Sequence, residues 1–458
     1  MVAADLSTSA SPPLSTRRER WAWYLYDFGN SAYAAVVLLA VYSAYFQGGV
    51  VGGPEGTRLW GLSVGLAMLV VALTAPVLGA IADFSGAKKR LLFFYTLMTV
   101  LFTGLLFFAR PGQVLIGMVA FILAEIGYRS GQVFYNALLP EIARPEEIGR
   151  VSGAGWAIGN VGGILCLLII LPLIVFIDNN FVIRLSLVIT AIFFALSSLP
   201  LFLWLPERAT RRSLPPGETY VSIAASRLRR SVRTTRRFKE FLKYMGAFIV
   251  FDGGIIMALD FAAIIGAVLF GLDQQQLILF VIIVQITNVF GAFFFGWLVD
   301  RLGGKQSLIL SLLVMLVVVI WLYFNRTALG FFFIGALAGV GMAGAQSVSR
   351  AMVALFSPPG RSAEFYGFFA MGGRASSFIG PAIYGFIAAE AALWYQAQGQ
   401  SAGTAEQLGQ RIAILAIAVF LALGLILLTF VNERAGRAAA LKAEAEPRPA
   451  PALDLPGA

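Results

Sequence analysis

The chain of 458 residues is 59% hydrophobic and only 13% charged, with a formal net charge of +10. Soluble domains are about 45–50% apolar and about 25% charged, so this composition excludes an ordinary water-soluble globular protein. Histidine is absent and Cys166 is the single cysteine, which excludes histidine-based metal sites, Ser-His-Asp triads, disulfides within the chain and thiolate metal clusters. We therefore expect a polytopic membrane protein with no metal and no cofactor.

Apolar runs predict twelve transmembrane helices, because a helix needs roughly 20 apolar residues to cross a bilayer. The predicted spans are 22–46, 59–82, 91–109, 112–139, 151–177, 182–205, 241–271, 274–299, 306–325, 328–356, 363–392 and 412–431. The longest polar break separates six spans from six. The predicted parts are a disordered tail over 1–20, a six-helix bundle over 21–205, a basic linker over 206–240, a second bundle over 241–431 and a disordered tail over 432–458.

The distribution of Lys and Arg predicts the orientation in the membrane. With a cytoplasmic N-terminus, 26 of the 34 basic residues fall on the cytoplasmic side and only five on the opposite side. Basic residues accumulate in cytoplasmic loops, so we expect both termini inside, in a bacterial inner membrane. The same distribution explains the net charge by topology and by contact with anionic membrane lipids, and it does not favour nucleic-acid binding.

A loop motif occurs twice, at a constant offset of 217 residues. The copy after span two consists of Gly79, Asp83, Gly86 and Lys88. The copy after span eight consists of Gly296, Asp300, Gly303 and Lys305. Two repeats of the same topology predict an all-α fold of two parallel six-helix repeats, related by an axis along the membrane normal as in major facilitator transporters.

The loop motif resembles the signature loop between helices two and three of the major facilitator superfamily. Segments 21–32, 134–141, 150–155 and 364–367, with Gly380-Pro381, are similar to segments of the vacuole-effluxer family within it. The resemblance implies a twelve-helix secondary transporter of the bacterial type. The family includes a fungal vacuolar amino-acid effluxer, so it also implies amino-acid transport.

Each loop residue has a physical interpretation beside the resemblance. We expect Gly79 and Gly296 to permit close helix approach, Gly86 and Gly303 to permit tight turns, and Lys88 and Lys305 to anchor the cytoplasmic face. The resemblance implies that Asp83 and Asp300 brace the opposite half in the outward-open state, near the starts of spans eleven and five. The alternative is that both motifs only form turns and set the topology.

Span five carries Gly155, Gly159 and Gly163 at a spacing of four residues. This stripe predicts close helix packing. The alternative is an antiporter-type glycine motif of related transporters, but Asn160 stands where that motif has proline. Export by antiport therefore has no support from the stripe.

Ionisable residues within the spans are costly and usually face a bundle interior or an aqueous cavity. The candidate substrate or coupling residues are Asp27 in span one, Glu125 and Arg129 in span four, Asp252 and Asp260 in span seven, and Arg374 in span eleven. Spans three, six, nine and twelve have none in their interiors. The resemblance implies that spans one, four, seven and ten line the central cavity, with span eleven at its border.

These charges allow more than one arrangement. Glu125 and Arg129 are i,i+4 neighbours and can pair with each other or bind solute. Arg374 can pair with Asp252 in the empty protein, and a zwitterion can replace that pair by placing its carboxylate on Arg374 and its amine on Asp252 or Asp260.

The sequence thus predicts a secondary transporter that moves a small polar solute, with amino acids as the first candidate, by alternating access. Export of another small metabolite or drug is the alternative, and a membrane-embedded enzyme or a non-transporting sensor is the alternative of a different class. We expect a monomer that contacts solute and lipids, and any coupled proton must use Asp or Glu. The sequence has no P-loop for ATP-driven transport.

Overall fold

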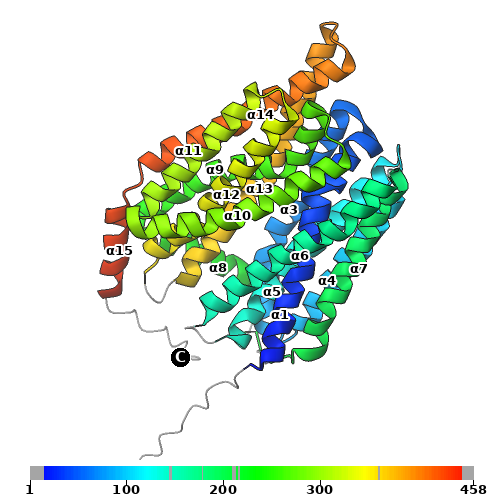
Figure 1. Cartoon of the computed structure of the whole chain (residues 1–458). Coiled ribbons are helices and arrows are strands. Elements are labelled where there is room, and N and C mark those ends of the chain that lie inside the picture. The colour runs from blue at the N-terminus through cyan, green and yellow to red at the C-terminus, as the bar shows by residue number, and fades with distance from the viewer. Residues whose placement is uncertain are drawn as a thin grey trace, which may run out of the picture.

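The computed structural model describes residues 15–143, 147–177, 179–208, 213–214, 217–358 and 362–445, and within them every regular element is helical. Twelve helical segments are long and apolar enough to cross a membrane, which confirms the predicted number of spans. The protein is therefore an integral, multi-pass membrane protein. Figure 1 shows the helices of each half grouped together, with linker helix α8 between the halves.

The first span of the N-terminal half is interrupted by π-helical turns and consists of α1 (Arg17–Tyr33), η1 (Ala34–Ala40), α2 (Tyr42–Ala44) and η2 (Tyr45–Val51). The other elements of this half are α3 (Gly53–Phe84), α4 (Lys88–Leu105) with η3 (Leu106–Phe108), α5 (Val114–Ile142), α6 (Ile148–Phe176) and α7 (Asn180–Trp204). The first helix begins at Arg17, within the predicted tail, because Thr16 and Glu19 form a capping box.

The C-terminal half consists of α9 (Lys239–Phe270), α10 (Gln274–Leu302), α11 (Gly304–Phe324), α12 (Ala328–Phe356), α13 (Ser362–Ala397) and α14 (Ala402–Thr429). Helix α14 begins ten residues before the predicted span. Ser401 caps its polar first turns, and Arg411 donates hydrogen bonds to the carbonyls of Tyr323 and Asn325. The predicted span began later because only the part of this helix that follows the polar turns is apolar.

Two helices lie in segments that we expected to be a linker and a disordered tail. Helix α8 (Tyr220–Thr235) forms in the basic linker and packs against α3, α13 and α9, with Ile223 and Ala224 buried. Helix α15 (Glu433–Ala445) follows Asn432, whose side chain accepts a hydrogen bond from the Ala435 amide, and it packs against α12 and α9. The expectation of a disordered tail is therefore wrong for 433–445, because capping and packing stabilise this alanine-rich stretch.

The two ends of the bundle pair differ in how the halves meet. We call the end at which α1 begins and α14 ends the terminal side, and the opposite end the distal side. On the distal side α3 packs directly against α13: a Cβ added at Gly61 would lie 2.4 Å from the Pro381 carbonyl oxygen and 3.2 Å from Gly385 Cα. On the terminal side, α8 contacts both of these helices.

Candidate functional site

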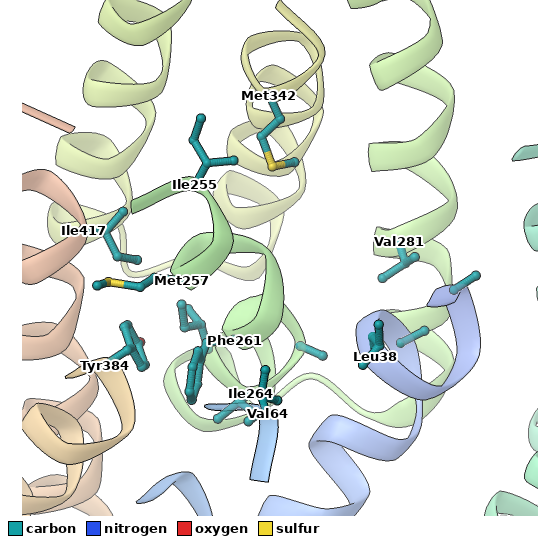
Figure 2. Packing of buried hydrophobic residues seen from close by; sticks show 14 of the residues in the cluster. Leu38, Val64, Ile255, Met257, Phe261, Ile264, Val281, Met342, Tyr384 and Ile417 are labelled. Atoms are coloured by element: carbon teal, nitrogen blue, oxygen red, sulfur yellow. The ribbon is translucent and has the colours of Figure 1, made fainter. Parts of the chain in front are cut away.

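A layer of aromatic and amide side chains closes the distal side, and we call Thr57, Trp60, Phe121, Phe261, Tyr384 and Gln410 the distal seal. Trp60 donates from Nε1 to the Asp260 carbonyl at 3.0 Å, which joins α3 to α9. Gln410 donates to Thr57 Oγ1 at 2.9 Å and accepts from the Tyr384 hydroxyl at 2.8 Å. Ring centroids are 4.6 Å apart for Trp60 and Phe121, and 4.2 Å apart for Phe261 and Tyr384, which are adjacent in Figure 2.

Charged residues of α5 lie one to two turns below this seal, toward the terminal side. Arg129 Nε donates to Glu125 Oε1 at 2.7 Å, so the predicted i,i+4 pair is present. The Glu125 side chain is fully buried, whereas the Arg129 side chain is 32% exposed. A guanidinium exposed at mid-helix must face water rather than lipid, because charge in the hydrocarbon region is costly. This exposure indicates an aqueous cavity below the seal.

The buried oxygen of this pair has an unusual environment. Glu125 Oε2 and the Tyr33 hydroxyl are both buried and lie close enough to interact with each other, and no other residue that the structure describes forms a hydrogen bond with either group. The Ser130 hydroxyl, in the next turn of α5, is also buried without a partner in the same described set. Unsatisfied buried polar atoms are rare and call for an unplaced partner such as water, a proton or a solute.

The predicted pair of Arg374 and Asp252 is wrong for this conformation: no ion pair joins them. The Asp252 carboxylate instead accepts a hydrogen bond from the Ser376 hydroxyl. The reason is the helical phase of α13. Its Gly372 and Gly380 pack against α9, whereas Arg374 lies one turn from Phe378, on the face that meets α3.

Asp260 lies closer to the distal seal than the other acids of α9. Its carbonyl accepts the Trp60 hydrogen bond, and its carboxylate lies within electrostatic reach of Arg129 and Glu125. Asp260 is 6% exposed. The structure therefore brings Glu125, Arg129 and Asp260 together across the two halves, while Asp252 lies apart beside Ser376.

Asp27 lies on the α1 face that packs against α6. A Cβ added at Gly159 would lie 2.6 Å from Asp27 Oδ2, one added at Gly155 would lie 2.4 Å from the Trp23 ring, and one added at Gly163 would lie 3.2 Å from the Ser31 carbonyl. The glycine stripe therefore packs closely against α1, as predicted. Gly162, which the spacing argument omitted, is still closer, at 2.1 Å from the Phe28 carbonyl.

The repeated loop motifs lie at the terminal ends of α3 and α10. Gly86 and Gly303 have φ values of +62° and +88°, which confirms that they permit turns. Gly79 and Gly296 differ from expectation, because a Cβ added at either would meet nothing within 4 Å. Direct contact between α3 and α13 is at the distal side, so the terminal ends of these spans have no need for small residues here.

The acidic members of the two motifs, Asp83 and Asp300, lie in the last turns of α3 and α10 and are exposed. The suggested contact of Asp83 lies near the start of span eleven, where the side chains of residues 361–364 are outside the described part of the structure. The suggested contact of Asp300 lies at the start of α6, and Asp300 forms no ion pair there with a described residue. A bracing role in another conformation stays a prediction.

The lysines of the motifs bind within their own halves. Lys88 Nζ lies 2.6 Å from Glu141 Oε1, and Lys305 Nζ donates to the Thr429 and Val431 carbonyls at 2.9 and 2.7 Å. The sequence analysis missed a second shared feature, which is a glutamate just after the sixth helix of each half. Glu207 accepts from the Lys89 amide at 2.8 Å, and Glu433 accepts from the Lys305 amide at 2.8 Å.

These glutamates cap the starts of α4 and α11, where free amides and the helix dipole favour a carboxylate. Partial burial raises the pKa of the Glu207 carboxyl, while the Lys89 amide acts in the opposite direction. In the sequence, Glu207 and Glu433 are each the first acidic residue after the sixth apolar run of their half. That recurrence was the signal in the sequence.

The distal seal was also missed. Gly61 and Gly65, spaced by four, indicate close helix packing but do not identify α13 as the partner. Chemically, the arrangement offers the guanidinium group of Arg129 with the carboxylates of Glu125 and Asp260 beneath the closed distal side. Such a site can bind a small solute that carries both charges.

Comparisons with known proteins agree with this architecture. The sequence profile of the family described as vacuole effluxer Atg22 like matches residues 60–441. The chain is 24% identical over 429 residues to the uncharacterized MFS-type transporter YxiO of Bacillus subtilis, covering 91% of this chain and 95% of YxiO. It is 28% identical over 326 residues to autophagy-related protein 22-1 of Neosartorya fischeri, covering 65% of this chain and 51% of that protein. The chain thus spans about half the length of that fungal relative.

Solved structures show the same fold at low sequence identity. A bacterial homolog of the human lysosomal transporter Spinster, in an inward-facing and unoccupied conformation, has a TM-score of 0.69 and 14% identity, with 93% of this chain and 99% of that chain covered. The nucleoside transporter NupG has a TM-score of 0.63 and 14% identity, with 92% and 98% covered. The fold is therefore that of the major facilitator transporters.

Proposed function

Because the chain belongs to the vacuole effluxer Atg22-like family of membrane transporters, we propose that it moves small zwitterionic solutes, amino acids first, by alternating access. The observation that carries this proposal is the group of Glu125, Arg129 and Asp260 directly beneath the distal seal, with the Arg129 side chain partly exposed. A cation and acids from both halves match a solute that carries a carboxylate and an amine.

The proposed transport cycle follows from the two unlike ends. The distal side is sealed by direct contacts between the halves, and we propose that the terminal side is cytoplasmic because it carries most of the basic residues. The conformation is then inward-open. In the opposite state the distal seal separates, and Asp83 and Asp300 brace the terminal ends of the halves.

One chain supplies both halves of the site, so the proposed working unit is a monomer. Asp27 and Glu125 are our candidates for proton coupling, because carboxylates are the only side chains suited to it in a chain without histidine. Asp27 lies on the α1–α6 contact, where a change in its charge would affect the packing of these helices.

Counterflow in proteoliposomes tests the proposed function. Vesicles loaded with a mixture of amino acids should accumulate a labelled amino acid faster than vesicles loaded with sugars or nucleosides. The double substitution of Glu125 and Arg129 to Gln should abolish this accumulation, whereas Arg110→Gln, an exposed distal loop change, should retain it. Accumulation driven equally well by sugars, or by none of the amino acids, would refute the amino-acid assignment.

A further inference from the structure

Arg374 of the C-terminal half faces the N-terminal half. On α13, the Phe378 carbonyl would lie 3.4 Å from a Cβ at Gly65, and the Pro381 carbonyl would lie 2.4 Å from a Cβ at Gly61. Arg374 precedes Phe378 by four residues and Pro381 by seven, so it shares their face of the helix. It therefore continues the face of α13 that contacts α3, just beyond the last contact.

Arg129 of the N-terminal half lies at a similar depth below the seal. It follows Phe121, which stacks on Trp60, by eight residues, or about 12 Å toward the terminal side. Arg374 lies about 11 Å from Pro381 in the same direction. Since Trp60 and Gly61 set one level on α3, the two arginines approach the cavity from opposite halves at one level, and they lie within electrostatic reach of each other.

Both guanidinium groups have donors to spare. Arg374 forms no hydrogen bond or ion pair with any residue that the structure describes. Arg129 uses only Nε for Glu125, and its two terminal nitrogens have no hydrogen-bond acceptor in the same described set. Glu125 pairs with Arg129 from within its own helix, whereas among the charged groups of the described residues it is Arg129 that acts on Arg374. Two partly buried cations repel each other unless an anion lies between them.

We propose that Arg129 and Arg374 together bind one carboxylate group between the two halves, and that their mutual repulsion keeps the empty transporter from closing on its terminal side. The proposal rests on the proposed function for the identity of the solute as an amino acid, but its electrostatic part holds for any small carboxylate. The planar fork of each guanidinium can donate two parallel hydrogen bonds to a carboxylate. Asp260 and Glu125 lie where the amine of the same solute would bind.

This arrangement makes closure dependent on the solute. A bound carboxylate removes the repulsion and joins the halves, whereas an empty site must bring two like charges together to close. The loaded transporter should therefore change state faster than the empty one, so that solute exchange is faster than net transport.

The first test compares ligands that differ by one charged group. Thermal stabilisation of the purified full-length protein should be strong with an amino-acid mixture, weaker with the matching short carboxylic acids, and absent with the amino-acid amides, which lack the carboxylate. Inorganic phosphate distinguishes a carboxylate site from a general oxyanion site and should not stabilise. Arg374→Gln should weaken amino-acid binding by roughly 10–150-fold, as expected for one charge-assisted hydrogen bond. Equal stabilisation by acids and amides, or stabilisation by phosphate alone, would overturn the proposal.

The second test needs no ligand. Spin labels attached to the cysteines introduced by Ser152→Cys and Gln306→Cys, in a Cys166→Ser background, would report the distance between the terminal ends of α6 and α11. Arg374→Gln should move the empty protein toward the shorter distance, while Arg374→Lys, which keeps the charge, and Arg110→Gln should match the parent. An unchanged distance in Arg374→Gln would overturn the repulsion. If Arg374→Gln gives the shorter distance but the parent protein shows no amino-acid counterflow, the repulsion between Arg129 and Arg374 is supported and only the amino-acid identity of the solute is rejected.

Discussion

The two ends of the helix bundles connect the same two halves by different means. At the distal end the backbones of α3 and α13 are in close contact, because a Cβ added at Gly61 would lie only 3.2 Å from the Gly385 Cα. The hydrogen bond from Trp60 to the Asp260 carbonyl also joins α3 to α9 there. At the terminal end, α8 contacts both α3 and α13 (Figure 1). A tight seal beside a cavity with charged walls is the arrangement expected of a carrier open to one side.

The difference also shows where side-chain size constrains the sequence. Small residues are needed where the seal closes, at Gly61 and Gly65, and not at Gly79 in the same helix, where a methyl group meets nothing within 4 Å. Substitutions at the two levels should therefore have unlike effects, and the charges between the levels should be the most sensitive of all.

The largest expected effect comes from breaking the ion pair beneath the seal. Arg129→Gln leaves the fully buried Glu125 carboxylate without its cation, which should lower the free energy of unfolding by roughly 3–5 kcal/mol. The double substitution of both residues to Gln should recover most of that loss, because no uncompensated charge stays buried. Thermal unfolding in lipid nanodiscs measures both. Equal destabilisation in the single and double variants would show that the loss of stability does not come from the unpaired Glu125 carboxylate.

A methyl group at the distal contact should have the next largest effect. Gly61→Ala places a Cβ 2.4 Å from the Pro381 carbonyl oxygen, so α3 and α13 must separate. Overpacking costs about 1–3 kcal/mol, which corresponds to a roughly 5–150-fold smaller sealed population.

The matched control for this change is Gly246→Ala, which lies in a helix where a Cβ meets nothing within 4 Å and should leave the population unchanged. A single cysteine at Val64, a buried residue one turn below Trp60 that is not part of the distal seal, would report opening of the distal side by its accessibility to a membrane-impermeant reagent added on that side. The idea of a sterically sealed end would fail if both alanine variants react at the parent rate.

The smallest of the three effects should follow from Trp60→Phe. This change keeps the aromatic contact with Phe121 and removes only the hydrogen bond to the Asp260 carbonyl. A hydrogen bond of this kind contributes about 0.5–1.5 kcal/mol, so a partial shift of the same accessibility is expected. Comparison with Trp60→Ala, which removes the ring as well, separates the bond from the packing, and an equal shift in both would assign the whole effect to the bond.

The sequence predicted the helices well because a lipid-spanning helix must be long and apolar, a requirement that each segment meets on its own. It predicted the pairing of Glu125 with Arg129 for the same reason, since i,i+4 neighbours on one helix meet without regard to the rest of the fold. The Arg374–Asp252 pair failed because it required the relative rotation of α9 and α13, which no local pattern specifies. The Trp60–Asp260 bond, between residues 200 positions apart, depended on the same information.

The glutamate caps have a consequence for how the chain is assembled during synthesis. Glu207, just after the sixth span, binds the start of the third, and Glu433 does the same in the second half. Each group of six spans thus ties its last segment back to its own middle and does not borrow a cap from the other group. The first half can complete its helix ends while the second is still on the ribosome, so biogenesis is able to proceed as two successive modules whose joining comes last.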